Sequence, residues 1–344
     1  MIFIIIMRYY GNKTKLLDFL SENISRLGLT SGASIFDAFS GTASVGKFFK
    51  KQGFRVISND ILYFSYILSK AQVTLNSEPK FKKVDTKVHV VDFLNEIDGV
   101  SGFITKNYSP FQGNVRQYFT IENAQKIDAI RAKIHAWKEE CLIDEDEEAY
   151  LICSLLMAVS SISNISGTYG SYLKSWDKRA FKPLRLERLE LFDNMENNVA
   201  LNCDIVEVVN NYHCDILYLD PPYNSRQYAS NYFLLELIAE GWFDSLPQIY
   251  GHTGMRPYTH QKSKFCTKKE AFYSIKEILD KNTSKYILLS YNNEGIIPVE
   301  DLLSLLQNYG SVDVESYTHK RYRSIKQDGS KPTTKEILFI CKTK

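Results

Sequence analysis

The chain has 344 residues, 44% hydrophobic and 24% charged, which is ordinary globular composition and enough for one large domain or two modest ones. The formal net charge of +2 excludes a protein whose whole surface is basic and binds nucleic acid. Any contact with nucleic acid must therefore come from local basic patches. The six cysteines form no C-x-x-C pair and have no histidine cluster near them, so we predict no metal site.

The apolar run at residues 1–7 is too short to span a bilayer and lacks the features of a secretion signal. We therefore expect a cytoplasmic protein with no membrane partner. Because the informative sequence begins at Arg8, Met7 is an alternative to Met1 as the natural start.

The next elements alternate between strands and helices. Residues 34–39 form a short apolar run that ends in Ser-Gly, residues 43–49 carry helical spacing, and residues 55–58 form a second short run. The same pattern returns at 216–219 and 286–290. Strands that alternate with helices predict a parallel sheet, and ligands of such sheets bind beyond the carboxyl ends of the strands. We expect the polar turns there to converge on one crevice.

The strand and helix alternation lapses between about residues 95 and 200. Six apolar residues from Ile121 to Trp137 fall on one helical face, and Thr120 is a candidate N-cap. A second helix, at about 147–162, is apolar on most sides and is expected to be buried. The sequence thus predicts a helical insertion of domain size.

The end of the chain has a different pattern. Two short runs, at 312–317 and 337–341, flank a polar stretch that contains Gly329 and Pro332. This pattern predicts a final antiparallel hairpin with a basic loop.

The sharpest motif is Asp220-Pro221-Pro222-Tyr223, directly after an apolar run. One interpretation is a rigid turn that ends a strand. The other interpretation is that the motif binds a substrate with an aromatic amino group. Such an amine is a poor nucleophile, because its lone pair is delocalised into the ring. The Asp220 carboxylate and the Pro221 carbonyl can each accept a hydrogen bond from that amine, which turns its lone pair toward a methyl donor. Tyr223 supplies a flat face for stacking an extruded base.

A second motif runs from Asp37 to Gly46, where a strand turns sharply into a helix. Gly41 allows close backbone approach to a ligand, although the G-x-G-x-x-G spacing of dinucleotide sites is missing. Asp60 follows the next strand, the position at which an acidic side chain binds a ribose in a mononucleotide-type half-fold. Asp60 is therefore the ribose-binding candidate.

Together these motifs resemble those of the Dam-like DNA adenine methylases over nearly the whole chain. Asn224–Tyr228, Ser290–Gly295 and His319–Arg323 resemble the subgroup that includes the NlaIII-like and FokI-like modification methylases. The resemblance implies an α/β fold: a Rossmann-like class I methyltransferase sheet, mostly parallel with the last strand antiparallel, and a mainly helical inserted recognition domain.

The resemblance also implies a domain order and a reaction. We expect a cofactor-binding half at 1–94, an inserted target-recognition domain at 95–198, and a catalytic half at 199–344. The expected reaction is site-specific methyl transfer from S-adenosylmethionine to N6 of a flipped adenine in double-stranded DNA. A cognate restriction endonuclease that acts separately is a possible partner.

Further cofactor-binding residues follow from the resemblance. The aromatic and lysine residues of the N-terminal element line the cofactor and active-site pockets, the strand-turn motif binds the methionine side, and an acidic residue with its neighbour contacts the cofactor adenine. With Asp60, the expected set is Tyr9, Tyr10, Lys13, Asp37, Phe39, Gly41, Asp204 and Ile205.

Basic residues interleaved with aromatic ones suit phosphate contact and base stacking. In the insertion the DNA-binding candidates are Tyr169, Tyr172, Lys174 and Arg179, whereas the alternating Arg and Glu of residues 185–190 fit a solvated helix equally well. In the final hairpin the candidates are Lys320, Arg321 and Arg323.

Two other readings stay open. A related Pro-Pro-Tyr loop can serve cytosine N4, an RNA adenine or a glutamine amide, although Asp rather than Asn at position 220 disfavours the amide by resemblance. The other is a non-catalytic DNA-binding specificity subunit, which loss of Asp220 or Tyr223 would have indicated.

Overall fold

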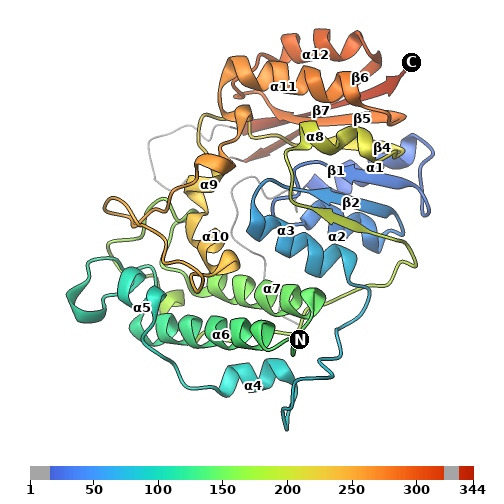
Figure 1. Ribbon diagram of the computed structural model, residues 1–344. Coiled ribbons are helices and arrows are strands. Elements are labelled where there is room, and N and C mark those ends of the chain that lie inside the picture. The colour runs from blue at the N-terminus through green and yellow to red at the C-terminus, as the bar shows by residue number, and fades with distance from the viewer. Residues whose placement is uncertain (1–15, 321–332) are drawn as a thin grey trace. The chain divides into compact units, whose positions relative to one another are not determined.

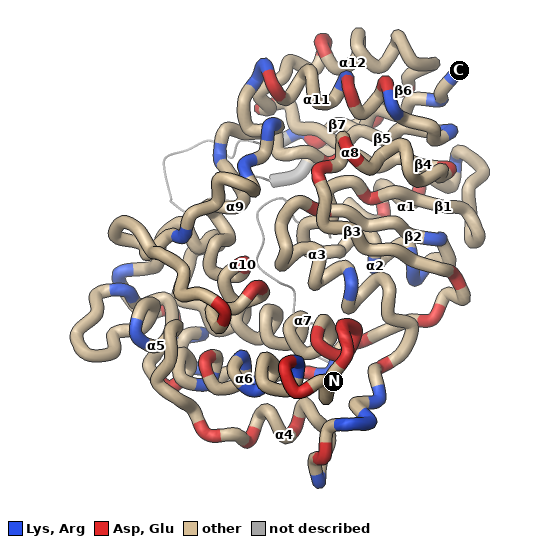
Figure 2. The backbone as a smooth tube through the Cα atoms, viewed as in Figure 1, with Lys and Arg blue, Asp and Glu red and all other residues tan. Residues whose placement is uncertain are grey.

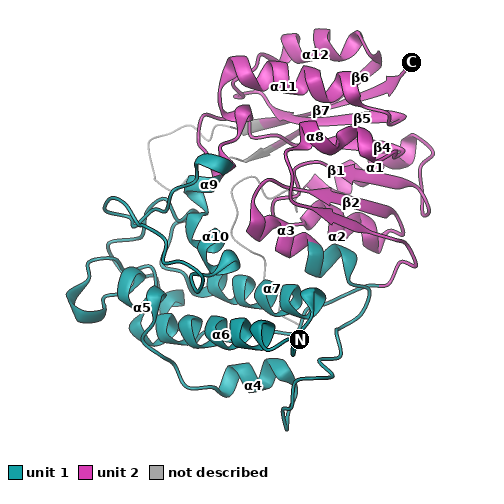
Figure 3. Ribbon diagram, viewed as in Figure 1, with its two compact units in different colours: residues 1–12, 70–192, 229–260 teal, residues 13–69, 193–228, 261–344 magenta. Residues whose placement is uncertain are grey.

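A computed structural model describes residues 16–320 and 333–344, and the chain divides into two compact units (Figures 1 and 3). Within the described residues, the helical unit comprises 70–192 and 229–260, and the sheet unit comprises the rest. The division into domains at 94/95 and 198/199 stays a prediction. The compact units have other boundaries, with residues 70–94 and 229–260 grouped with the helical unit.

The sheet unit contains a seven-stranded sheet in the order β3-β2-β1-β4-β5-β7-β6. The first five strands in that order are parallel, and β7 pairs antiparallel with both β5 and β6. The predicted fold class is confirmed, including the antiparallel hairpin at the end of the chain. The strands are β1 (Ser34–Asp37), β2 (Arg55–Asn59), β3 (Val199–Leu201), β4 (Ile216–Leu219), β5 (Tyr286–Asn292), β6 (Gly310–Lys320) and β7 (Thr333–Thr343).

The central strands β4 and β5 are buried along their whole length, which explains why they read as continuous apolar runs. Alternate side chains of the strands form one core cluster with α8, α11 and α12, and α2 and α3 pack on β2. The helices of this unit are α1 (Leu17–Arg26), α2 (Ser44–Lys51), α3 (Tyr63–Ser69), α8 (Ile205–Val208), α11 (Lys268–Lys281) and α12 (Val299–Gln307).

The strand register determines which residues meet at the carboxyl edge of the sheet. Asp37, the last residue of β1, pairs with Ser58 on one side and with Tyr218 on the other. Asp60 and Asp220 each follow their paired residue by two positions. Parallel pairing therefore brings the turns after β1, β2 and β4 to one edge, as the sequence predicted.

The helical unit is built from α4 (Val90–Glu96), α5 (Phe103–Tyr108), α6 (Ile121–Glu139), α7 (Glu145–Ile162) and α10 (Phe233–Glu240). The predicted N-cap is confirmed, because the Thr120 hydroxyl accepts a hydrogen bond from the Asn123 amide at 3.2 Å. The second predicted helix begins two residues early, because Asp144 and Glu147 form a capping box. Within the described residues, no helix is both long and apolar enough to cross a membrane.

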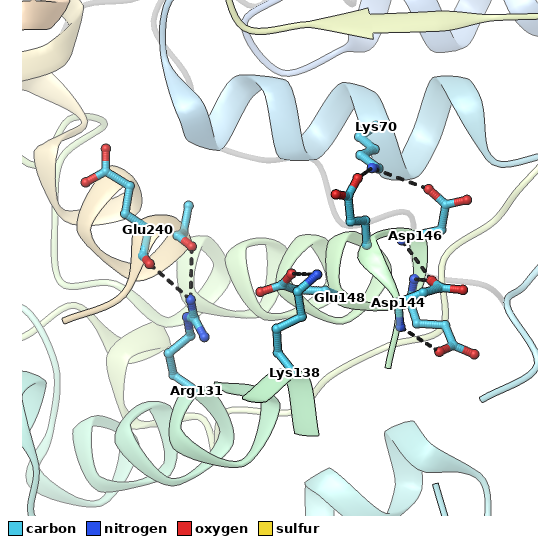
Figure 4. A network of polar contacts seen from close by, with 10 residues as sticks. Lys70, Arg131, Lys138, Asp144, Asp146, Glu148 and Glu240 are labelled. Carbon is cyan, nitrogen blue, oxygen red and sulfur yellow. Dashed lines mark hydrogen bonds and ion pairs between the residues drawn. The ribbon is translucent and has the colours of Figure 1, made fainter. Parts of the chain in front are cut away.

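One arginine explains why residues 229–260, which follow the D-P-P-Y motif in the sequence, belong to the helical unit. Arg131 of α6 is 3% exposed and donates hydrogen bonds to the carbonyls of Ile238, Ala239 and Glu240 at 2.9–3.2 Å. Figure 4 shows the Arg131 side chain pointing toward Glu240 at the end of α10. A cation that satisfies the last carbonyls of α10 also opposes the negative end of that helix. The contact therefore anchors α10 to α6.

Ion pairs support the N-terminal end of α7 (Figure 4). Lys70 lies 3.0 Å from the Glu145 carboxylate and 3.5 Å from that of Asp146, and Lys138 of α6 lies 3.0 Å from Glu148. The acidic partners of Lys70 are exposed. We expect these pairs to add little stability compared with the buried contact of Arg131.

We predict that Asp128→Ala lowers the free energy of unfolding by about 3 kcal/mol, because it leaves buried donors without a partner. The Asp128 carboxylate is 2% exposed and accepts four hydrogen bonds, from the amides of Gly102, Ile104 and Thr105 and from the Thr105 hydroxyl, at 2.6–3.0 Å. It thereby caps the N-terminus of α5 from its own position on α6.

Urea denaturation measures the change in the free energy of unfolding. In the control Asp92→Ala, which removes an exposed ion pair with Arg188, the loss should be about 0.5 kcal/mol; equal losses would contradict the prediction.

Candidate active site

The carboxylate of Asp37 lies at the carboxyl end of β1 and is 1% exposed. Among the described residues, neither of its oxygens has a hydrogen-bond partner. Burial raises the pKa of Asp37 well above its ordinary value, and the nearby carboxylates of Asp220 and Asp60 raise it further. The amides of Phe39 and Gly46 lower the pKa, but neither meets the geometry of a hydrogen bond. Asp37 is thus a buried acid in a negative environment.

Asp60 follows β2 and holds the turn after β1. Its Oδ2 accepts a hydrogen bond from the Gly41 amide at 2.8 Å, and its Oδ1 accepts one from the Leu62 amide at 3.0 Å. Gly41 has φ +52°, a left-handed conformation that favours glycine. Burial raises the pKa of Asp60 to about 6, although both amides lower it. Each carboxylate oxygen keeps a lone pair for a further donor.

Sequence reasoning missed a residue that connects these turns. Asn59 is 1% exposed, and its Nδ2 donates to the carbonyls of Ala38 (3.3 Å) and Cys203 (3.2 Å). Its Oδ1 accepts a hydrogen bond from the Cys203 amide at 3.2 Å, and Asn202 donates from its side chain to the Asp60 carbonyl at 2.8 Å. One amide therefore joins the carboxyl ends of β1, β2 and β3. Asparagine before Asp60 was visible in the sequence, but no spacing signal marked it.

The predicted adenine-contacting residues lie at the start of α8. Asp204 caps that helix, and its Oδ2 lies 3.2 Å from Nζ of Lys264. Ile205 is 3% exposed and belongs to the core cluster. The Phe39 ring is half-buried and meets the Phe265 ring edge-on at 4.9 Å between centroids. Asp204, Ile205 and Phe39 are therefore all held in place by contacts within the sheet unit.

The D-P-P-Y turn follows β4 directly. Pro221 is buried, whereas Asp220 and Tyr223 are half-buried. The Tyr223 carbonyl accepts a hydrogen bond from the Ile296 amide at 3.0 Å, and its ring lies edge-on to Tyr291, 6.3 Å between centroids. The turn is thus supported by the segment that follows β5.

Two amide side chains give a structural role to motifs that the sequence left without one. Gln227 forms paired hydrogen bonds with the backbone of Ser263, at 3.0 Å as donor and 2.8 Å as acceptor. Asn292, at the end of β5, accepts from the Glu294 amide at 2.7 Å and donates to Glu336 at 3.3 Å. These contacts fix the segments that follow β4 and β5.

The geometry favours a cationic ligand with hydroxyl groups. Asp37, Asp60 and Asp220 lie close enough for the charges of the latter two to raise the pKa of the first. A positive ligand group would relieve that repulsion, and hydroxyl donors could bind the remaining lone pairs of Asp60. Among the described residues, no group of three or more His, Cys, Asp or Glu side chains is placed to hold a metal ion.

Some predicted site residues cannot be placed. Tyr9, Tyr10, Lys13, Arg321 and Arg323 lie outside the described residues. The backbone of Lys320 ends β6, but its side chain is likewise outside the described part. Their roles stay predictions.

The DNA-binding candidates of the insertion have different environments. The expectation for Tyr169 is wrong: its ring is fully buried, stacks on Tyr118 at 6.4 Å, and its hydroxyl lies 2.9 Å from Oγ of Ser163, so it has no surface to offer DNA. Lys174 and Arg179 are exposed, and Arg179 pairs with Asp177.

Tyr172, the remaining candidate of the insertion, is half-buried. Its hydroxyl lies 2.8 Å from Nε2 of His252, a residue that follows α10 in the chain. Its ring lies edge-on to Tyr118, 5.1 Å between centroids. Tyr172 therefore stays a candidate for DNA contact, and its neighbour His252 was not predicted.

Comparison with curated proteins gives several long matches. The chain is 44% identical to the Type II methyltransferase M.FokI of Planomicrobium okeanokoites over 345 residues, which cover 98% of this chain and 53% of that protein. It is 38% identical to the modification methylase StsI of Streptococcus sanguinis, covering 98% and 52%. It is 35% identical to the Type II methyltransferase M.NlaIII of Neisseria lactamica, covering 94% of each. The chain thus spans about half the length of the first two and nearly all of the third.

A family comparison agrees with these matches and covers most of the chain. The sequence profile of one family matches residues 9–305, a range that includes all three clustered carboxylates and the D-P-P-Y turn. The chain therefore belongs to the D12 class N6 adenine-specific DNA methyltransferases.

Proposed function

We propose that this chain transfers a methyl group from S-adenosylmethionine to N6 of an adenine flipped out of double-stranded DNA. The observation that carries the proposal is the cluster of Asp37, Asp60 and Asp220 at the ends of β1, β2 and β4. Burial and the two neighbouring carboxylates raise the pKa of Asp37, and among the described residues neither of its oxygens has a hydrogen-bond partner. S-adenosylmethionine is positively charged at its sulfonium and supplies the methyl group when bound.

The cofactor would be held by residues of three adjacent turns. Asp60 would accept hydrogen bonds from ribose hydroxyls, and Asp37, with Phe39 and Gly41, would face the cationic methionine side. Asp204 and Ile205 would bind the adenine end. Support comes from the orphaned carboxylate of Asp37 and from the left-handed turn at Gly41, which brings backbone close to the site. Tyr9, Tyr10 and Lys13 remain part of the proposal by family resemblance.

The target amine would meet the D-P-P-Y turn. Asp220 and the Pro221 carbonyl would each accept one of its hydrogen bonds, which directs the nitrogen lone pair toward the methyl group. Asp220 acts here as a hydrogen-bond acceptor that polarises the amine more than as a strong base. Pro222 gives the turn its rigidity, and Tyr223 would stack on the extruded base.

The family description favours DNA adenine over cytosine N4 or an RNA adenine as the acceptor. The presence of both Asp220 and Tyr223 disfavours a non-catalytic specificity subunit. The relatives described above are two Type II methyltransferases and a modification methylase. We extend the proposal to a restriction-modification system in which a cognate endonuclease is a separate protein. We also propose that this chain acts in the cytoplasm, where its DNA substrate lies.

Asp220→Ala should reduce methyl transfer about 100-fold or more, because the target amine loses its charged acceptor. Cofactor affinity should fall much less, by about tenfold at most, since the direct partner of Asp220 is the amine and its charge acts on the cofactor only from a distance. Methyl-label incorporation and calorimetry measure the two quantities. The exposed Asp313 of β6 provides the control Asp313→Ala, with both quantities unchanged. Near-normal turnover in the Asp220 variant would remove this residue from the mechanism.

Cofactor affinity should fall as the pH drops below about 6, because burial raises the pKa of Asp60 to about 6 and only the ionised carboxylate offers all its lone pairs to the ribose. The sign follows from linkage: a proton that must leave before binding weakens binding by up to about tenfold for each pH unit below the pKa.

Calorimetry between pH 5.5 and 7.5 tests this linkage. Asp60→Asn should bind weakly at pH 7.5 and show a smaller pH dependence, which separates Asp60 from the other acids of the site. A wild-type affinity that is constant across the range, or an Asp60→Asn variant with the same profile, would show that Asp60 does not bind the ribose.

Asn59→Ala should weaken cofactor binding about tenfold, because the three turns lose the amide that holds them in register. We expect kcat at saturating cofactor to fall less than the affinity does. The matched control is Asn198→Ala, which removes an amide bonded to the Val56 amide at 2.9 Å, at the opposite end of β2. Both variants should lose similar stability in thermal melts. Equal cofactor affinities in the two would mean that Asn59 has only a structural role.

A further inference from the structure

A short turn in the helical unit is closed by a pair of backbone hydrogen bonds. The Tyr250 amide donates to the Met255 carbonyl at 2.7 Å, and the Met255 amide donates to the Tyr250 carbonyl at 2.9 Å. Gly251 and Gly254 within the turn have φ +66° and +73°, which permit the tight reversal. We call residues 250–255 the tip turn. It lies in the segment after α10, for which the sequence predicts no element.

The tip turn is held by side chains that bind its backbone. Arg116 donates to the carbonyls of Gly251 (3.1 Å) and His252 (3.0 Å), and the hydroxyl of the buried Tyr108 donates to the Gly254 carbonyl at 2.7 Å. A Cβ at Gly254 would lie 2.9 Å from both Arg116 and Tyr108, so a larger residue does not fit. The turn is therefore fixed at its backbone while its own side chains remain available.

The base of the turn is fixed as well. Arg256, which follows it, is 7% exposed and forms a two-pronged ion pair with Glu240 of α10 at 2.6 and 3.1 Å. Such a pair restrains position and orientation together. Functional loops are commonly held rigid in this way by residues that do not touch the ligand.

The side chains of the tip turn are exposed and polar. Tyr250 is 51% exposed, and its hydroxyl donates to Oε1 of the exposed Gln248 at 2.6 Å. His252 is exposed, and its Nε2 lies 2.8 Å from the Tyr172 hydroxyl, which leaves Nδ1 for another partner. Thr253 is half-buried. Together they offer hydrogen-bonding groups at the end of a rigid turn.

Two neighbouring segments of the helical unit, 105–117 and 164–182, complete this surface. Gln117 donates to the carbonyls of Leu173 (3.0 Å) and Lys174 (2.6 Å), so the two segments are joined to each other, and Arg116 and Tyr172 join them to the tip turn. We call the three segments the tip face.

The charge of the tip face is strongly positive, although that of the chain is only +2. Its acidic residue is Asp177, and Figure 2 shows Lys and Arg gathered around α5. Its basic residues are Lys106, Arg116, Lys174, Lys178, Arg179 and Lys182.

We propose that the tip turn reads bases of double-stranded DNA and that the lysines of the tip face contact the flanking phosphates. The inference rests on the proposed function and adds the element that determines specificity. The tip turn is closed by a single bridge between Tyr250 and Met255, and it presents hydrogen-bonding side chains at its end. In the major groove each base pair presents a distinct pattern of donors and acceptors that such side chains can read. Local positive charge supplies affinity for phosphate without sequence preference. His252 and Thr253 are the base-reading side chains, and Lys174 and Lys178 bind phosphate.

The test compares two kinds of variant on DNA whose methylated motif has been mapped with the wild-type protein. His252→Ala should lower the methylation rate at that motif about tenfold or more. It should also lower the specificity ratio, which is the rate at the motif divided by the rate at sites that differ by one base pair. The double variant Lys174→Ala/Lys178→Ala should weaken binding equally at all sites and reduce the slope of log affinity against log salt by roughly 2.

The controls are matched residues of the sheet unit. His213→Ala replaces an exposed histidine, and Lys268→Ala/Lys269→Ala replaces an exposed lysine pair; both should leave motif, rate and salt slope unchanged. Thermal melts and cofactor calorimetry confirm that each variant is folded.

The base-reading role is overturned if His252→Ala leaves the ratio of the rate at the motif to the rate at near-motif sites unchanged, even if both rates fall. An unchanged rate and salt slope in all the tip-face variants also overturns it, because the tip face would then make no contact with DNA. If the wild-type protein methylates no DNA adenine, it is the proposed function that fails.

Discussion

The structure depends on the crowding of buried carboxylates at the carboxyl edge of a parallel sheet. Asp37 is almost fully buried, and its two carboxylate oxygens have no hydrogen-bond partner among the described residues, while Asp60 and Asp220 add negative charge around it. Such an arrangement is unfavourable in a protein that binds nothing, because burial penalises each charge and the charges repel. A cationic cofactor, as proposed, would offset both costs, because its positive charge would attract the carboxylates that repel one another.

The same edge must also hold its shape under this repulsion. Asn59 provides the restraint by binding the backbone of the turns after β1 and β3 while its own strand leads into Asp60. The D-P-P-Y turn is restrained separately, through Ile296 and the end of β5. The acids that would bind the cofactor and the turn that would bind the amine are therefore supported by different neighbours, and a substitution in one support should leave the other group in place.

Much of the fold was predictable because local signals were strong. The apolar runs of β1, β2, β4 and β5 follow from burial on both faces, and the Thr120 cap and the Ile121–Glu139 helix follow from periodicity. The three residues of β3 are half-exposed and too few for a pattern. Tyr169 was misassigned because interleaved basic and aromatic residues look alike whether the aromatic ring packs inward or outward. The tip turn and Asn59 carry no spacing signal, since their roles come from backbone contacts made across the fold.

The most direct test of the account is to incubate the purified protein with methyl-labelled S-adenosylmethionine and unmethylated genomic DNA, followed by nucleoside analysis and long-read mapping. The account predicts label in N6-methyladenine, confined to one short sequence motif. Label on cytosine, or only on RNA or protein, would contradict the assignment of the acceptor while leaving the fold and the cofactor site in place.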